Sequence, residues 1–142
     1  MTASDTRTSA DPRRRVGIAL AAALVVIALG LALRITGRGL GVPAFIVKYG
    51  GSTLWAVMVY FLLAALLPRV SSRRLGLLAL AIAVIVEASR LIHMPWLNSF
   101  RLTLAGALLL GRIFSLWNVV AYVVGILIGI WIDRSATRPA SA

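Results

Sequence analysis

The stretch from residue 87 to residue 101, EASRLIHMPWLNSFR, contains an acid, an arginine and a histidine. Glu87, Arg90 and His93 follow one another at spacings of three residues, which places successive members side by side along one helix. A carboxylate beside an imidazole could transfer protons, and a guanidinium beside an imidazole could bind an anionic group. The residues from Leu75 to Glu87 are otherwise apolar. Charge is costly in such surroundings, so the cluster is a candidate functional site.

Further polar residues are predicted to reach the same end of the membrane. A third helix that runs outward places Glu87 about 18 Å from its cytoplasmic end, at about 1.5 Å per residue. Asn118 and Tyr122 fall in the outer half of the last helix, and Arg101 falls in the outer loop. We therefore predict a ligand-binding or polar cluster of Glu87, Arg90, His93, Arg101, Asn118, Tyr122 and Trp55.

Each of these residues also has a purely structural interpretation. Glu87 could be the ion-pair partner of Arg90 or Arg101, and Arg90 could instead extend to the membrane interface. His93 could be an interfacial anchor, and Asn118 could join two helices by hydrogen bonds. From the residues alone, both interpretations stay open.

The composition is typical of a membrane protein. Of the 142 residues, 61% are hydrophobic and 13% are charged, whereas soluble domains have about 45–50% apolar and about 25% charged residues. The absence of cysteine excludes disulfides and thiolate chemistry. One histidine and four acids argue against a metal site made by the protein alone. We therefore expect no metal ion and no other cofactor.

The net charge of +11 raises the question of a nucleic-acid partner. We reject that partner, because the basic residues lie at the ends of the apolar segments. There they orient the protein and contact anionic lipid. The expected partner is therefore membrane lipid, with a membrane-protein partner as the open alternative.

The apolar segments predict an all-α, polytopic membrane protein with a bundle of four transmembrane helices. The glycine-rich residues 34–51 are predicted to form a loop. Residues 102–111 are too few to span a bilayer, so we predict a re-entrant or interfacial helix there, with the front of a tilted fourth helix as the alternative. The four spanning helices are expected at about residues 16–33, 52–67, 75–92 and 113–132.

This organisation gives a single transmembrane domain, residues 16–132, between two tails. Residues 1–15 are predicted to be a disordered tail and residues 133–142 a polar tail. Basic clusters before Val16 and after Pro68 predict that both tails are cytoplasmic.

The last predicted helix carries a GxxxG pattern at Gly125 and Gly129. These glycines share one stripe of the helix with Asn118 and Tyr122. Because such glycines let helix backbones approach closely, we assign both to helix packing.

Three stretches resemble a known bacterial family over roughly residues 34 to 132. They are KYGGSTLWAVMVYFLLAALLPR, EASRLIHMPWLNSFRLTLAGALLLG and FSLWNVVAYVVGILIG. The family is called domain of unknown function 2809. The resemblance implies a small multi-pass protein of the bacterial inner membrane without an assigned biochemical activity. The matching positions are Leu54, Trp55, Glu87, Ser89, Leu91, His93, Pro95, Trp96, Leu97, Arg101, Thr103, Trp117, Tyr122 and Gly125.

Three positions depart from the pattern of that family. Ser52 and Asn118 stand where the family usually has Asp, and Arg90 stands where it has Gln. A mechanism that needs those two carboxylates is therefore in doubt for this chain. The spacing of the polar residues is also similar to that of the VanZ-like family, which is associated with glycopeptide resistance.

Four classes of function remain, and we rank binding of an amphiphile first. A lipid or cell-wall precursor could present an anionic head group to Arg90, Arg101 and His93. A structural subunit of a membrane complex ranks second. A proton-coupled transporter that uses Glu87 ranks third, because Arg90 one turn away opposes a cation site. An enzyme ranks last, because the chain offers no second carboxylate, nucleophile or metal set beside Glu87 or His93.

Overall fold

A computed structural model describes residues 11–110 and 114–137 of the chain. Every regular element in these residues is an α-helix, as predicted. The helices are α1 (Pro12–Thr36), α2 (Ala44–Leu66), α3 (Ser72–Ser89), α4 (Pro95–Leu102), α5 (Leu104–Leu109) and α6 (Leu116–Thr137).

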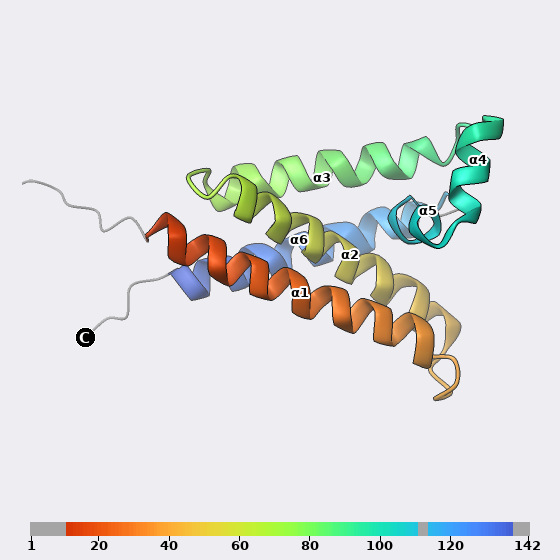
Figure 1. Ribbon diagram of the computed structural model, residues 1–142, viewed down its shortest axis with the longest axis horizontal. Coiled ribbons are helices and arrows are strands. Elements are labelled where there is room, and N and C mark those ends of the chain that lie inside the picture. Colours follow the sequence, from red (N-terminus) through yellow and green to blue (C-terminus); the bar gives the residue numbers. More distant parts are fainter. Residues whose placement is uncertain (1–10, 111–113, 138–142) are drawn as a thin grey trace, which may run out of the picture.

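Four long helices run side by side along the molecule (Figure 1). Helix α2 packs against α1, α3 and α6, and α3 also packs against α6. Helix α1 begins and α6 ends at one end of the bundle, which we call the terminal end. The short helices α4 and α5 lie at the opposite end, which we call the distal end.

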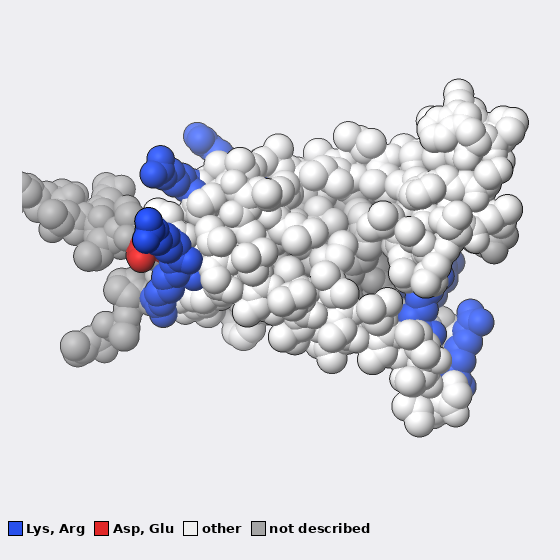
Figure 2. Space-filling view, in the orientation of Figure 1, with Lys and Arg blue, Asp and Glu red and all other residues white. Residues whose placement is uncertain are grey.

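Three of the long helices could cross a membrane by length and composition. They are α1, α2 and α6, and α1 is the most apolar of them. Helix α3 has 18 residues, among them Arg73, Arg74 and Glu87, so its composition alone does not mark it as a span. Figure 2 shows Lys and Arg side chains at both ends of the molecule, with an uncharged surface between them on the visible face. This distribution is typical of a protein that lies across a bilayer.

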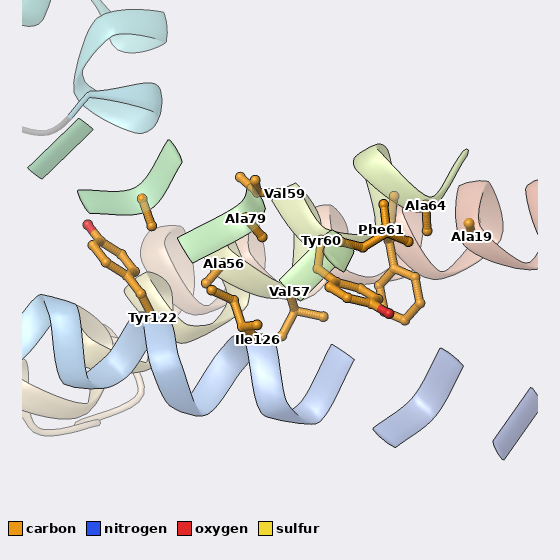
Figure 3. Close-up of a cluster of buried hydrophobic side chains, with 13 residues drawn as sticks. Ala19, Ala56, Val57, Val59, Tyr60, Phe61, Ala64, Ala79, Tyr122 and Ile126 are labelled. Atoms are coloured by element: carbon orange, nitrogen blue, oxygen red, sulfur yellow. The ribbon is translucent and has the colours of Figure 1, made fainter. Parts of the chain in front are cut away.

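Small side chains and a few aromatic rings fill the space between the long helices (Figure 3). Ala56, Ala64 and Ala79 are almost fully buried. Tyr60 and Phe61 contact each other edge to face, with ring centroids 5.5 Å apart. Small residues at helix contacts let the backbones approach closely, which is how helices associate where no water drives them together.

The predicted packing role of the α6 glycines agrees with their surroundings. A Cβ atom at Gly125 would overlap the backbone carbonyl of Thr53 in α2. A Cβ atom at Gly129 would lie 2.9 Å from Cδ1 of Tyr60, also in α2. The glycine stripe of α6 therefore lies directly against α2.

The largest error in the predicted boundaries concerns residues 34–51. Helix α1 continues to Thr36 and α2 already begins at Ala44, so the predicted loop is reduced to residues 37–43. Gly50 and Gly51 are helical rather than turn residues. A Cβ atom at Gly50 would lie 3.1 Å from Cδ2 of Leu33, so this glycine serves the close contact between α1 and α2.

The tail predictions also need correction near the bundle. Residues 1–10 and 138–142 lie outside the described residues, but residues 12–15 belong to α1 and residues 133–137 belong to α6. The start of α1 has a local cause. Asp11 accepts a hydrogen bond from the backbone N of Arg13 at 3.0 Å. Pro12 occupies the first turn, where a backbone N–H has no acceptor within the helix, so the N–H that proline lacks costs no helical hydrogen bond.

Most of the other helix boundaries differ from the predicted ones by one helical turn or less. Helix α3 covers residues 72–89 instead of 75–92, and α6 begins at residue 116 and ends at 137 instead of covering 113–132. The segment 102–111 was predicted as one short helix. Its residues 102–110 are the end of α4 followed by α5, divided at Thr103, whose side chain accepts a hydrogen bond from the backbone N of Gly106 at 3.0 Å. Residues 111–113, at the junction of the two predicted segments, lie outside the described residues.

Candidate functional site

The carboxylate of Glu87 is buried against the beginning of α6. Its side chain is 1% exposed. Oε1 accepts hydrogen bonds from the backbone N of Ser115 at 2.7 Å and from Nδ2 of Asn118 at 3.1 Å. Oε2 accepts one from the hydroxyl of Tyr122 at 2.8 Å. The last turn of α3 is therefore fixed to the first turns of α6 through a single acid.

Arg90 follows α3 directly and completes the surroundings of this acid. Its Nη1 lies 2.5 Å from Oε2 of Glu87. Its Nη2 donates to the hydroxyl of Tyr122 at 3.1 Å, and its Nε donates to the carbonyl of Leu110 at 2.6 Å. The charge of Glu87 is thus balanced by Arg90, one of the two partners that the sequence left open. A buried ion pair is tolerated when its remaining polar atoms are hydrogen-bonded in this way.

Two residues of α2 extend this arrangement. The hydroxyl of Ser52 donates to Oδ1 of Asn118 at 3.3 Å. The ring of Trp55 lies 5.4 Å from the ring of Tyr122, at an angle of 49°. We call Ser52, Trp55, Glu87, Arg90, Asn118 and Tyr122 the distal network. It joins α2, α3 and α6, and it includes the three positions at which the chain departs from the resembled family.

His93 does not belong to the distal network. A helix continued to His93 would have placed it beside Arg90 on the face of Glu87, but α3 ends at Ser89 and the chain then turns toward Pro95. His93 is exposed, and its Nδ1 lies 3.0 Å from the carbonyl of Leu91. The residue before a proline disfavours helix, and here the helix ends five residues earlier.

Arg101 is buried, but at a different place. Its Nη1 donates to the carbonyl of Ile92 at 2.9 Å and to Oδ1 of Asn98 at 3.3 Å, and its Nη2 donates to the carbonyl of Ser89. These contacts hold α4 against the carbonyl end of α3. Within the described residues no ion pair joins Arg101 to Glu87, so the alternative pairing of Glu87 with Arg101 is absent.

A cavity of about 850 Å³ lies beside the distal network. Every member of the network except Glu87 contributes to its wall. The remaining wall comes from the second half of α1, the first half of α2 and from α5. Apolar side chains in it include Val26, Ile27, Leu31, Val47, Leu54 and Met58.

Three exposed cations border the same cavity, namely Arg34, Arg38 and Lys48. None of them forms an ion pair with a carboxylate in residues 11–110 and 114–137. The nearest acid of this end, Glu87, is already balanced by Arg90. The cavity therefore combines a predominantly apolar interior with an uncompensated positive charge.

A second polar network, which the sequence analysis did not identify, lies at the terminal end. Asp133 of α6 is 3% exposed. It accepts hydrogen bonds from Nε and Nη2 of Arg15 at 3.1 and 2.6 Å. It also accepts bonds from the hydroxyls of Tyr60 at 2.7 Å and Ser72 at 2.8 Å. We call Arg15, Tyr60, Ser72 and Asp133 the terminal network.

The terminal network joins all four long helices. Nη1 of Arg15 also donates to the carbonyls of Pro68 and Val70, at 2.8 Å each, in the turn between α2 and α3. Asp133 continues the stripe of Gly125 and Gly129 on α6, four residues beyond the second glycine. The position of Asp133 on this stripe is the feature of the sequence that indicates a buried acid. It is absent from the predicted site because residue 133 falls in the predicted polar tail.

No group of three or more His, Cys, Asp or Glu side chains able to hold a metal ion occurs in the described part of the chain.

Comparison with known families agrees with the resemblance found in the sequence. No solved structure matches the chain. The model of one family, "Protein of unknown function (DUF2809)", matches residues 41–126. The chain therefore belongs to this family.

Proposed function

We propose that this member of the DUF2809 family binds an amphiphile with an anionic head group in the cavity beside the distal network. The observation that carries the proposal is the cavity itself, about 850 Å³ in volume, with apolar walls and with Arg34, Arg38 and Lys48 at its border. An apolar tail and an anionic head match these two kinds of wall. A lipid or a lipid-linked precursor of the cell wall belongs to this class of ligand.

The electrostatics of the cavity favour an anion. Arg34 and Arg38 have no carboxylate partner among the described residues. A phosphate or carboxylate group between such side chains accepts charge-assisted hydrogen bonds, which are shorter and stronger than neutral ones. The attraction is larger at a membrane than in bulk water, because the surrounding dielectric constant is lower.

Trp55 supplies a further contact for a ligand. It lines the cavity, and its Nε1 is buried without a hydrogen-bond partner in the described residues. A buried donor without an acceptor costs free energy. An ester or phosphate oxygen of a bound amphiphile would satisfy this N–H group.

The distal network then acts as the support of the cavity. Helix α5 forms part of the wall and packs against α4 but against none of the long helices. The bond from Nε of Arg90 to the carbonyl of Leu110 fixes the end of α5 to the network. Glu87 holds Arg90 in place from the other side. In this arrangement the role of Glu87 is to position Arg90.

The same geometry speaks against coupling to a cation. A proton or metal ion at Glu87 would compete with a guanidinium at 2.5 Å, and a nearby positive charge disfavours that binding. Transport driven through Glu87 and catalysis by it are therefore less well supported than binding.

We further propose a multi-pass arrangement in the bacterial inner membrane with α3 as a fourth span. Helix α3 packs along α6 and α2, and its acid is neutralised by Arg90, which lowers the cost of placing it in lipid. Arg73 and Arg74 lie in its first turn, near the interface. Helices α4 and α5 are interfacial in this arrangement, and the terminal end faces the cytoplasm.

Binding can be measured by native mass spectrometry of the protein in non-ionic detergent with phosphatidylglycerol as the probe. The variant R34Q/R38Q/K48Q should bind this lipid in the distal cavity about tenfold more weakly than the parent does, because each basic residue near an anionic group adds attraction. Phosphatidylcholine, which has no net charge, should bind equally to both proteins.

The matched control is R13Q/R14Q/R74Q, which removes the same charge from exposed arginines away from this cavity. It should retain the distal lipid. An equal loss in both triple variants would mean that overall charge, and not the cavity, attracts the lipid, and the proposal would then fail.

A further inference from the structure

A second cavity lies at the terminal end, about 720 Å³ in volume. The start of α1, the turn between α2 and α3, the start of α3 and the end of α6 surround it. Four arginines line it, namely Arg15, Arg69, Arg73 and Arg134. These residues come from three separate stretches of the sequence, around residues 15, 69–73 and 134, so only the fold brings them to one cavity.

The charge of this cavity is unevenly compensated. Arg15 is balanced by Asp133, with Nη2 and Oδ2 2.6 Å apart. Arg69, Arg73 and Arg134 are exposed and form no ion pair within residues 11–110 and 114–137. The cavity thus holds a neutral ion pair at its inner side and three uncompensated guanidinium groups around it.

Other donors border the same space. Ser71, the N-cap residue of α3, contributes to the wall and makes no side-chain capping bond, and the first turn of α3 borders the same space. Backbone N–H groups at the start of a helix are donors without a partner in the helix. Together with the three guanidinium groups they suit an acceptor that has several oxygen atoms.

We propose that this cavity binds the phosphate group of an anionic phospholipid head. Arginine can bind phosphate through two parallel hydrogen bonds. A phosphate group offers more acceptor oxygens than a carboxylate, so it can contact three arginines more fully. The cavity lies at the start of α1 and the end of α6, both of which are long and apolar enough to cross a membrane. A phospholipid head at the membrane surface lies at that level, whereas its acyl chains can follow the apolar exposed surface of the helices.

This site is separate from the distal one, because the two cavities have no lining residue in common. It also differs from a general attraction between basic residues and a membrane. Arg13, Arg14 and Arg74 are exposed near the same end but do not line the cavity. A general attraction would depend equally on both sets of arginines. A specific lipid site would depend only on the arginines that line the cavity.

The test uses the full-length protein in non-ionic detergent and counts bound phosphatidylglycerol by native mass spectrometry. The parent should bind lipid at two sites. The variant R69Q/R73Q/R134Q should lose one of them, with binding there at least about tenfold weaker. The variant R13Q/R14Q/R74Q is the matched control and should keep both sites.

The distal variant R34Q/R38Q/K48Q separates this proposal from the proposed function. It should lose the other site and keep the terminal one. A parent with one lipid that only R69Q/R73Q/R134Q removes would support the terminal site and contradict the distal one. Equal loss in R69Q/R73Q/R134Q and R13Q/R14Q/R74Q, or no loss in either, would overturn the terminal site.

Inorganic phosphate distinguishes a lipid from a free ion. It should displace phosphatidylglycerol from the terminal site only weakly, because it lacks acyl chains. Displacement by phosphate at a concentration equal to that of the lipid would show that the lipid assignment is wrong. Melting temperatures of all three variants should equal that of the parent, because the exchanged side chains are exposed and have no ion-pair partners among residues 11–110 and 114–137.

Discussion

The two ends of this bundle each bury one carboxylate, and they do so in different ways. Glu87 at the distal end pairs with Arg90, three residues further along the chain. Asp133 at the terminal end pairs with Arg15, which is 118 residues away. Each acid also accepts a hydrogen bond from a tyrosine, Tyr122 in the first case and Tyr60 in the second. The chemistry is the same, but the sequence separation is not.

That difference gives the two networks different tasks. The terminal network connects α1, α2, α3 and α6, so its ion pair closes the whole bundle. The distal network connects α2, α3 and α6 and leaves α1 out, so that a cavity remains between α1 and the network. The comparison shows how one motif, an acid with an arginine and a tyrosine, can close a bundle at one end and support a binding space at the other.

The largest effect is expected from breaking the terminal ion pair. The variants Asp133→Asn and Arg15→Gln should each lower the free energy of unfolding by about 3–5 kcal/mol, because the partner stays buried without compensation. The melting temperature in detergent measures this loss. Arg14→Gln, an exposed neighbour of Arg15, is the control and should melt like the parent. A D133N protein that is as stable as the parent would show that this pair does not close the bundle.

A smaller effect is expected at the distal end. Glu87→Gln and Arg90→Gln should each lower expression and melting temperature, because an unpaired charge in a bilayer costs about 2.5–3.5 kcal/mol. The double variant should recover part of the loss, since it leaves neither charge alone.

The combination of Glu87→Gln with Arg101→Gln serves as the control for that recovery. It should recover nothing, because Arg101 binds the carbonyls of Ser89 and Ile92 instead of Glu87. Recovery in this control, or a Glu87→Gln variant as stable as the parent, would contradict the ion pair.

The smallest effect on the protein is expected in a test of which end of the bundle faces the cytoplasm. Reporter fusions after Ala142 and within residues 37–43 should report opposite sides of the membrane, the first cytoplasmic. Residues 37–43 lie between α1 and α2, and the other fusion only extends the chain at its end, so the fusions should not affect stability. A periplasmic signal from the C-terminal fusion would contradict the proposed orientation. A common side for both fusions would remove one of α2, α3 and α6 from the set of spans, because these three helices separate the two positions.

Local spacing was enough to predict several features of the distal end. Glu87 and Arg90 are three residues apart, and the period of the helix makes such residues neighbours whatever surrounds them. The sequence also predicted that Asn118 and Tyr122 lie at about the same level in the membrane as Glu87, because helix rise converts sequence position into depth. Their hydrogen bonds to Glu87 are known only from the structure. The glycine stripe of α6 was likewise predicted from its period of four.

The sequence by itself therefore determined the membrane class, the all-helical fold and the pairs that lie within one helical turn. Only the tertiary structure decided which distant residues meet, such as Arg15 with Asp133 and Arg90 with Leu110. It also decided that Gly50 lies within α2 and packs against Leu33 of α1, and that His93 turns away from Glu87. The physical reason is that neighbours within a helix follow from its fixed period, whereas contacts between helices depend on how all their faces pack at once.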